Sequence, residues 1–354
     1  MKRFGILVAA CAALACEAVP TEPPATTVVS TPLVTTPAPI TTSQATPGYF
    51  AHDLGVLTGE EDSWALGINN RRVIVGRSGD LPFRWTIQGG MEALGTFDAA
   101  GGEARAINNA GEIVGWTWVP DETFPSVIRQ GATRWNRNGQ AHLLEQVWPR
   151  HSVARAINEK GDVAGNVPGD WGLIWPTRGG VIEVCREFGD VDLHGINDRG
   201  QVVGRRWGPT HGTWYTYSGI VWSVERPSCA PLVTGGVVAG SVHEINNRAD
   251  LLVFGIEGEY DPTVPDGIRT TGPIGGFVLR RGAVATRLPF GASAMNKRGD
   301  IVGNLNGEAY FLSHRGKLIH LGAGQASAIN DRGDVAGRNG GRAVIWTPQP
   351  LRKR

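Results

Sequence analysis

The sequence predicts an all-β fold, a seven-bladed β-propeller of four-stranded blades that is closed by its N-terminal strand. Three observations predict it. The phrase "AINNAGEIVGW" recurs, in degenerate form, in seven copies along the chain. Glycine and tryptophan are abundant, with 50 and 12 copies in 354 residues, which favours many turns and β-rich packing. No long stretch shows the apolar period of a helix.

The N-terminus has the pattern of an export signal. Met1-Lys2-Arg3 is positive, and the following "FGILVAACAALA" is too short to span a bilayer. "ALAC", ending at Cys16, resembles a bacterial lipobox, which implies that Cys16 becomes the lipidated first residue of the mature chain. "VAAC", ending at Cys11, is a second candidate, and ordinary cleavage near Ala15 is a third. We expect residues 1–16 to be a lipoprotein-type signal.

Residues 17–48 are rich in proline and threonine and show no apolar periodicity. Such a segment buries too little apolar surface to offset the entropy of ordering, and extended Pro-rich chains act as spacers. The sequence therefore predicts a disordered spacer that holds a globular domain away from a membrane surface. We expect one propeller over 49–348 and a basic tail over 349–354.

The repeat is anchored by an asparagine that follows an apolar step. It falls at Asn69, Asn108, Asn158, Asn197, Asn246, Asn296 and Asn330, spaced 34 to 50 residues apart. A four-stranded propeller blade takes about 40 to 45 residues, so each copy corresponds to one blade. A third strand carries Trp or Phe, which we expect in the core between blades, at Trp85, Trp135, Trp175, Trp222, Phe277, Phe311 and Trp346.

Each asparagine is expected to begin a turn, because its side chain can accept from backbone amides two residues on. A glycine three residues later can take the positive φ of the hairpin loop. The first copy has Arg72 there and the fifth has Ala249. Those two turns are expected to be strained or differently shaped.

The ends of the chain indicate how the ring closes. The seventh copy ends at "AVIWTPQP" without a final strand, whereas "YFAHDLGVL" at 49–57 precedes the first turn and matches "IHLGAG" at 319–324. We expect the N-terminal strand to complete the last blade, which also covers an otherwise exposed edge.

The phrases "GINDRGQVVG", "IVW" and "DLG" resemble the HAF repeat of bacterial extracellular proteins. The resemblance covers nearly the whole chain after the spacer, although the His-Ala-Phe triplet itself is not spelled out. It implies an exported repeat protein. It carries no reaction, cofactor or catalytic residue.

Differences between blades are where a binding site is expected, because insertions in repeat proteins mark the binding face. The connection between the second and third strands is long at 117–131, 205–219 and 255–276. Aromatic side chains outside the repeat positions accompany this face: Trp116, Trp118, Trp171, Trp207, Trp214, Tyr215, Tyr217 and Tyr260. They suit stacking on sugars or anchoring a partner chain, or they bury their own loops.

A second difference lies three residues before each asparagine. The residues there are Leu66, Arg105, Arg155, His194, His243, Ser293 and Ser327. If the first strand is innermost, four adjacent blades present a basic arc near the channel that could receive a carboxylate, sulfate or phosphate. The alternative is that these side chains sit between blades and bond backbone carbonyls.

Charge and motifs exclude several classes. The net charge of +1 lacks the basic footprint of a nucleic-acid-binding protein. There is no GxSxG, HExxH or Cys/His metal spacing, and the loop acids Glu257, Glu259, Asp261 and Asp266 do not form an EF-hand. We expect no metal and no cofactor. Glu244, beside His243, is the only acid in the inner strand positions, which is weak support for catalysis.

The sequence therefore favours a noncatalytic binding or scaffold module at the bacterial envelope, monomeric and lipid-anchored at the outer membrane or cell surface, or else secreted. Its expected ligand is a glycan or an envelope protein. The first alternative is a propeller hydrolase or lyase acting on an envelope or extracellular polysaccharide, and the second is a structural protein without a ligand. Cys185 and Cys229 could pair in an oxidising compartment, but equivalent strands diverge towards the rim, so their pairing stays open.

Overall fold

A computed structural model describes residues 48–97, 101–121, 127–144, 151–209, 215–234, 236–261, 263, 268–281, 283–349 and 351, together with strand 42–46. Of residues 42–46, 209, 215, 216, 234, 260 and 268 only the backbone is described. The expected lipidation site Cys16, its alternative Cys11, most of the spacer, Trp214 and residues 352–354 lie outside the described residues. Within the described part of the chain there is no helix, so none that could cross a membrane.

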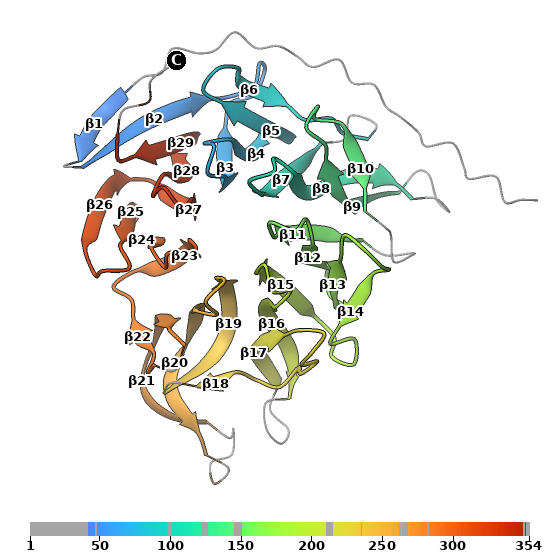
Figure 1. Ribbon diagram of the computed structural model, residues 1–354, viewed down its shortest axis with the longest axis vertical. Coiled ribbons are helices and arrows are strands. Elements are labelled where there is room, and N and C mark those ends of the chain that lie inside the picture. The colour runs from blue at the N-terminus through green and yellow to red at the C-terminus, as the bar shows by residue number, and fades with distance from the viewer. Residues whose placement is uncertain are drawn as a thin grey trace, which may run out of the picture.

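The strands form seven sheets arranged around a central axis, which confirms the predicted seven-bladed β-propeller of four-stranded blades (Figure 1). Blade one is β3 (Ser63–Ile68), β4 (Ile74–Ser78), β5 (Leu81–Thr86) and β6 (Gly90–Ala93). Blade two is β7 (Gly102–Ile107), β8 (Ile113–Pro120), β9 (Ile128–Trp135) and β10 (Ala141–Leu143). Blade three is β11 (Val153–Ile157), β12 (Val163–Asn166), β13 (Gly172–Trp175) and β14 (Ile182–Val184).

The remaining blades follow the same antiparallel order. Blade four contains β15 (Val191–Ile196), β16 (Val202–Pro209) and β17 (Tyr215–Trp222). Blade five contains β19 (Val237–Ile245), β20 (Leu251–Tyr260), β21 (Ile268–Leu279) and β22 (Thr286–Arg287), preceded by β18 (Val233–Thr234). Blade six is β23 (Gly291–Met295), β24 (Ile301–Leu305), β25 (Glu308–Leu312) and β26 (Leu318–Ala323). Blade seven contains β27 (Gln325–Ile329), β28 (Val335–Asn339) and β29 (Arg342–Thr347).

The N-terminal strand β2 (Tyr49–Gly55) completes blade seven by pairing antiparallel with β29. Tyr49 packs in the core between blades six and seven, and Leu54 packs in the core between blades seven and one. The predicted closure is therefore confirmed. The same strand seals the edge of the last blade and joins the two hydrophobic clusters beside it.

Two details differ from the regular pattern. Strand β1 (Thr42–Thr46) lies within the segment expected to be spacer, yet it pairs with the outer edge of β2, so at least these five residues depart from the predicted disordered spacer. In blade four the fourth strand is reduced to a bond from Leu232 N to Gly219 O (2.8 Å), because β18 pairs with β19 of blade five instead.

The repeated aromatic residues lie between blades, as predicted. Trp135, Trp346 and Phe277 are among the largest fully buried side chains. Separate hydrophobic clusters fill the junctions between neighbouring sheets. Burial of each such side chain contributes about 1.5 to 3 kcal/mol. These residues therefore hold the ring together and leave its centre free.

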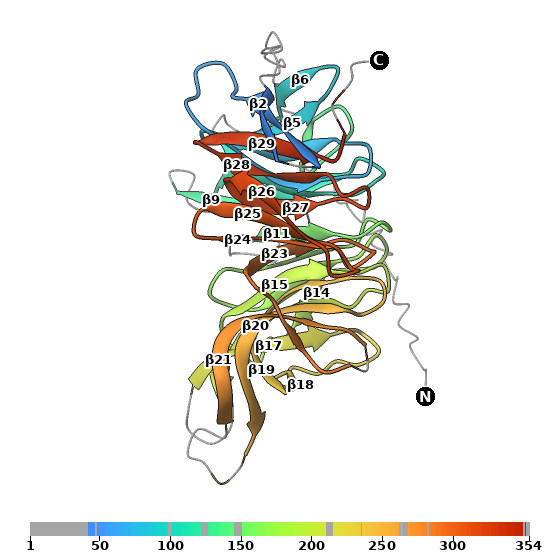
Figure 2. The same ribbon diagram turned by 90° about the vertical axis from the view of Figure 1, so that its left-hand side faces the viewer.

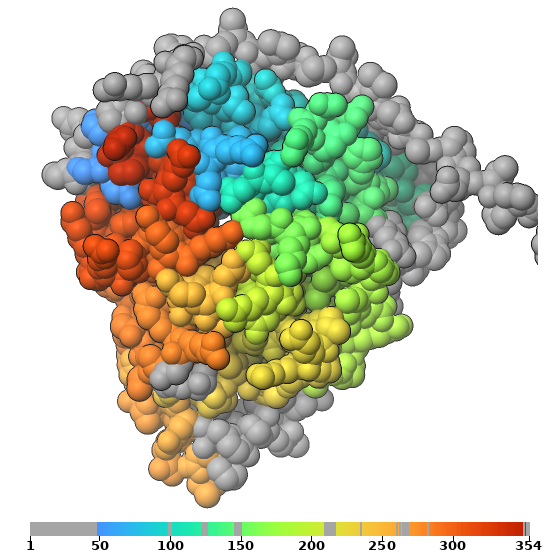
Figure 3. Space-filling view, viewed as in Figure 1, coloured from blue at the N-terminus to red at the C-terminus, as the bar shows by residue number. Residues whose placement is uncertain are grey.

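The asparagine turns all lie on one face of the ring, the turn face, which is towards the viewer in Figure 1. Six of the seven asparagines accept from the amide two residues on, for example Arg71 N to Asn69 Oδ1 at 3.0 Å, whereas Asn108 accepts from Glu112 N, four residues on. Arg72 and Ala249 keep the common turn at positive φ, 62° and 61°, so of the two expected alternatives the structure shows strain. In Figure 3 the seven blades meet at the centre of this face.

The long connections lie on the opposite face, the long-loop face. Most of their expected length is strand rather than loop, because β8 and β9, β16 and β17, and β20 and β21 continue beyond the rest of their blades. Figure 2 shows the ring from its edge, with the β20–β21 hairpin projecting from it.

Cys185, after β14 of blade three, and Cys229, in blade four, form a disulfide with Cα atoms 5.8 Å apart.

Candidate functional site

Every innermost strand contains a β-bulge three residues before its asparagine. The ladder skips one residue there, as between Ala104 and Ala106 in β7 and between Val242 and Glu244 in β19. A bulge leaves one residue unpaired and redirects its side chain. The skipped residues are the seven singled out from the sequence: Leu66, Arg105, Arg155, His194, His243, Ser293 and Ser327.

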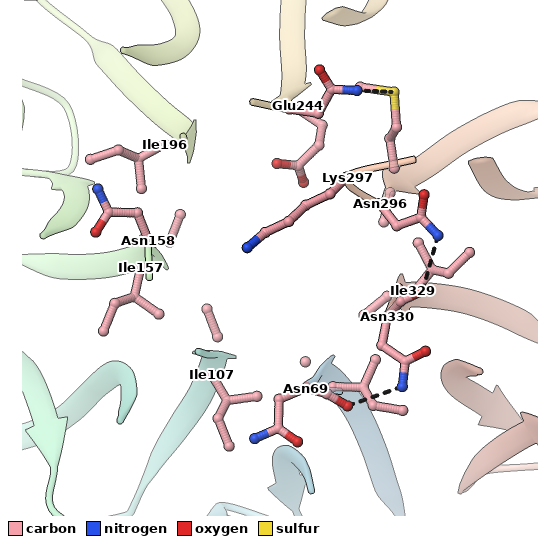
Figure 4. Close-up of a pocket in the computed structure, with 18 of the residues that line it drawn as sticks. Asn69, Ile107, Ile157, Asn158, Ile196, Glu244, Asn296, Lys297, Ile329 and Asn330 are labelled. Carbon is pink, nitrogen blue, oxygen red and sulfur yellow. Dashed lines mark hydrogen bonds between the residues drawn. The ribbon is translucent and has the colours of Figure 1, made fainter. Parts of the chain in front are cut away.

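The innermost strands enclose a cavity of about 290 Å³ on the axis of the ring. Its wall includes four layers, counted inwards from the turn face. The first layer is formed by the polar residues that follow the repeat asparagines, and the second by the asparagines themselves. The third is a ring of isoleucines with one methionine, and the fourth is formed by bulge residues. Figure 4 shows these isoleucine and asparagine side chains around the open centre. The volume suits one sugar ring or a small acid.

Glu244 interrupts a ring of small residues in this cavity. The other six blades have Gly or Ala at its position: Gly67, Ala106, Ala156, Gly195, Ala294 and Ala328. The carboxylate reaches blade four, because a Cβ built at Gly195 would lie 3.2 Å from its Oε1. Burial raises the pKa of Glu244 to about 7, although the backbone amide of Ile245 acts in the opposite direction. Figure 4 shows the side chain pointing into the cavity.

His194 and His243 form a pair, with ring centres 5.3 Å apart. His194 Nδ1 lies 3.2 Å from the Val242 carbonyl oxygen. A carbonyl can only accept, so this contact favours the tautomer with the proton on Nδ1 and a lone pair on Nε2; Ser241 Oγ, 3.4 Å from Nδ1, can accept from the same proton. Burial, followed by the charges of His243 and Arg155, lowers the pKa of His194 to about 4. Burial and Arg205 lower the pKa of His243 as well.

Only two of the four residues of the expected basic arc therefore carry charge at neutral pH, so the positively charged region is smaller than the sequence predicted. His194 lines the cavity and bonds a backbone carbonyl, so both sequence interpretations hold in part. His243 does not line the cavity, but its ring packs on His194. The charged part of the arc is Arg105 and Arg155, on adjacent blades two and three.

Arginines outnumber carboxylates around this end of the cavity. Arg105 Nη2 lies 2.8 Å from Glu103, which also pairs with Arg77. Asp192 is shared between Arg155 at 3.4 Å and Arg205 at 2.8 Å. Four guanidinium groups thus share two carboxylates in these ion pairs, so the positive charge is not fully neutralised.

Two aromatic pairs flank the arc on blades two and four. The Trp116 and Trp118 rings meet edge to face with centres 5.1 Å apart. Trp207 and Tyr217 do the same at 5.0 Å, and Trp207 is 39% exposed. Tyr217 is fixed by a bond to Asp190 at 2.5 Å and by the Arg205 guanidinium, 4.1 Å over its ring. These pairs offer ring surface close to the charged arc.

The other predicted aromatic residues contribute less. Trp171 is half-buried against the core between blades two and three, with Arg186 over its ring, which fits the interpretation that it buries its own loop. Trp214 lies outside the described residues, and of Tyr215 and Tyr260 only the backbone is described.

The turn-face end of the cavity is held by hydrogen bonds between blades. Six asparagines donate Nδ2 to the next asparagine carbonyl at 3.0 to 3.2 Å, whereas Asn246 faces Met295 Sδ at 3.9 Å. At that junction Lys297 replaces the acceptor side chain found in neighbouring blades. Its ammonium crosses the cavity to Glu159 (3.1 Å) and Asp198 (3.5 Å), as Figure 4 shows for the extended side chain.

The described residues contain no cluster of three His, Cys, Asp or Glu side chains that could hold a metal ion.

Sequence reasoning pointed to Glu244 but missed Asn166, which supports Arg155 in the arc. Asn166 follows the apolar step that ends at Gly165, and its role depends on a contact across the blade that no sequence spacing reveals.

Comparisons with known proteins bear on the fold. No protein-family model matches the sequence, and no curated protein matches it. Among solved structures, virginiamycin B lyase from Staphylococcus aureus has a TM-score of 0.52 at 9% identity, covering 84% of this chain and 99% of that one. A streptogramin B lyase gives 0.48 at 11% identity, with 86% and 99% covered. A gluconolactonase from Xanthomonas campestris gives 0.43 at 13%, with 91% and 98% covered. At 9% identity the likeness to virginiamycin B lyase shows a shared fold alone.

Proposed function

We propose that this chain is a propeller enzyme of the lyase or hydrolase type, acting on an anionic, glycan-like substrate at the cavity. The observation that carries the proposal is that His194 and Glu244, two titratable groups with opposite pKa shifts, line the same cavity. One group is a neutral imidazole with a favoured tautomer, and the other is a carboxyl with a pKa of about 7. Pairs of titratable groups whose pKa values are pushed apart by their surroundings are typical of acid–base catalysis.

The arrangement favours elimination next to a carboxylate. Arg105 and Arg155 hold the substrate carboxylate and stabilise the charge that develops on it. His194 Nε2 removes the proton from the adjacent carbon, and the electron pair of that C–H bond forms a double bond. The bond to the leaving oxygen breaks, and protonated Glu244 gives its proton to that oxygen. Histidine and carboxyl groups commonly fill these roles.

The fold likeness to a lyase supports this proposal over the noncatalytic module that the sequence favours. The second candidate remains such a module, and a specific observation favours it. The aromatic pairs Trp116–Trp118 and Trp207–Tyr217 offer ring surface that suits sugar stacking without any chemistry.

The test is turnover of defined acidic polysaccharides by the purified protein. Pectate, alginate and a neutral glucan would be incubated with it, and double bonds and new reducing ends measured separately. Double bonds support a lyase, and reducing ends without double bonds support a hydrolase. We expect His194→Gln and Glu244→Gln each to lower turnover at least a hundredfold, while His320→Gln, an outer-strand control, retains it. Saturable binding without either product would favour the noncatalytic module, and no binding would exclude both.

We also propose that the chain belongs with the HAF-repeat proteins and is exported as a monomer, anchored through a lipidated Cys16 at the envelope. The lipobox-like "ALAC" and the Pro/Thr-rich segment support this. Cys16→Ala should abolish incorporation of labelled fatty acid and release the protein from membranes. Labelling that is lost only in Cys11→Ala would move the anchor to that residue, and unchanged labelling in both would exclude lipidation there.

A further inference from the structure

We infer that Arg105, Arg155 and Asn166 form an oxyanion subsite for a carboxylate or sulfate group of an acidic sugar. The inference rests on the proposed function, whose substrate class it specifies. It starts from buried hydrogen-bond donors that have no acceptor among the described residues.

The first such donor is the Asn166 amide. Asn166 is 1% exposed, and its Oδ1 accepts from Arg155 Nε at 2.8 Å. Since a guanidinium can only donate, Oδ1 is assigned and Nδ2 is the free end. That Nδ2 has no hydrogen-bond partner in the described part of the protein. A buried donor without an acceptor costs about 1 to 3 kcal/mol, so it indicates that an acceptor belongs there.

The equivalent asparagine of blade six shows what a satisfied side chain looks like. Asn304, which also follows the Gly of the repeat, donates Nδ2 to Ser293 Oγ at 3.0 Å and to the Ala326 carbonyl at 3.1 Å. In blade three the bulge residue is Arg155 instead of serine. Its guanidinium takes the amide oxygen, and the amide nitrogen is left over.

The second donor is Arg105 Nε, which is buried without a partner although Nη2 of the same guanidinium binds Glu103. Burial, and after it the charge of Arg105, lowers the pKa of Arg155, so the two guanidinium groups influence each other. Two like charges held close together at the wall of a cavity are stabilised by an anion between them. Asn166 Nδ2 thus belongs to the side chain that holds the Arg155 guanidinium, Arg105 Nε belongs to the neighbouring arginine of the arc, and both donors lack an acceptor.

The ligand chemistry is therefore an oxyanion of one or two charges with several acceptor atoms. Planar carboxylates and sulfate esters both meet this description, since arginine pairs with either through parallel donors. Neutral sugars do not. The flanking aromatic pairs on blades two and four would contact the ring that carries the anion.

The test measures binding, and no turnover is needed. Glucuronate, glucose 6-sulfate, inorganic phosphate and glucose would be titrated calorimetrically into the full mature chain at constant ionic strength. We expect glucuronate or glucose 6-sulfate to bind and glucose not to. Asn166→Asp, which replaces the free donor by an acceptor, should weaken binding about tenfold or more. Arg105→Lys, which keeps the charge and removes Nε, should also weaken it. Asn304→Asp is the matched control and should leave affinity unchanged.

Equal affinity in wild type, Asn166→Asp and Arg105→Lys would overturn the inference, as would binding of none of the anions. If Asn166→Asp does not fold, Arg105→Lys decides alone. Phosphate binding without sugar binding would show an adventitious ion only. Anion binding by a protein that turns over no substrate would support the subsite and contradict the proposed enzymatic function. Turnover that neither variant changes would support the enzyme and exclude the subsite.

Discussion

At the residue scale, the cavity contains two titratable groups whose linkage to folding has opposite sign. The folded pKa of Glu244 is raised to about 7 from 4.5, so the folded state binds the extra proton and stability falls as pH rises through this window. The folded pKa of His194 is lowered to about 4 from 6.5, so the unfolded state binds the proton and stability falls as pH drops through that window. Between about pH 4.5 and 6.5 the two contributions oppose each other.

This opposition predicts how each substitution changes the pH dependence of the free energy of unfolding. Glu244→Gln removes the decrease in the free energy of unfolding that accompanies ionisation of this carboxyl towards pH 7. It should therefore raise the free energy of unfolding at neutral pH by about 1 to 3 kcal/mol. His194→Gln removes the loss towards pH 4 and should flatten the acidic side. Urea unfolding between pH 4 and 8 measures both. Parallel curves for wild type and Glu244→Gln would show that this carboxyl titrates normally.

A second residue-scale prediction concerns the hairpin turns. Gly111 has φ of 86°, and a Cβ there would meet nothing within 4 Å, so Gly111→Ala tests backbone strain alone. We expect a loss of about 1 kcal/mol, since left-handed conformations disfavour L side chains by 1 to 2 kcal/mol. Ala249→Gly, at the equivalent place with φ of 61°, should cost nothing or stabilise slightly. Thermal melts that rank the two variants the other way would contradict this.

At the element scale, β2 is the strand on which ring closure depends. It pairs with β29 along Phe50 to Gly55, and Tyr49 donates its hydroxyl to the Gly333 carbonyl at 2.9 Å. Strand β1 only extends the outer edge of the same sheet. The two strands therefore differ sharply in what their removal exposes.

Truncation tests this difference. Removing residues 1–48 deletes β1 and should leave a folded, soluble ring. Removing residues 1–56 also takes away the buried side chains of Tyr49 and Leu54, about 3 to 6 kcal/mol of burial, and exposes the edge of β29. We expect that variant to aggregate. Equal melting temperatures for the two truncations would mean that β2 is dispensable.

At the scale of the whole molecule, the disulfide ties blades three and four together near the aromatic pair of blade four. Cys185 and Cys229 are 44 positions apart in the sequence. For a loop of this length the chain-entropy model gives about 3 to 4.7 kcal/mol. The Cys185→Ser/Cys229→Ser double variant should therefore lose about 2 to 4 kcal/mol of stability. Free thiols at both positions in the non-reduced mature protein would contradict the bond.

The sequence predicted the ring, its blade number and its closing strand, because each of these follows from a repeat and its phase. For Arg105, Arg155 and His194 it left two positions open, at the channel or between blades, and the structure places all three in the cavity wall. The sequence assigned the asparagines only to turns, since their bonds to the next blade exist only once the ring is closed. The neutral state of His194 and the free amide of Asn166 arise from burial and packing across strands, which periodicity does not encode.

We propose that His194 and Glu244 act as base and acid, and the pH dependence of turnover reports on both groups at once. Turnover of the best acidic polysaccharide should rise as His194 loses its proton near pH 4 and fall as Glu244 loses its proton near pH 7. A bell-shaped profile with these limbs, together with collapse of turnover in Glu244→Gln, is the predicted result. Turnover that is flat from pH 4 to 8, or that survives intact in the His194→Gln/Glu244→Gln double variant, would contradict the account.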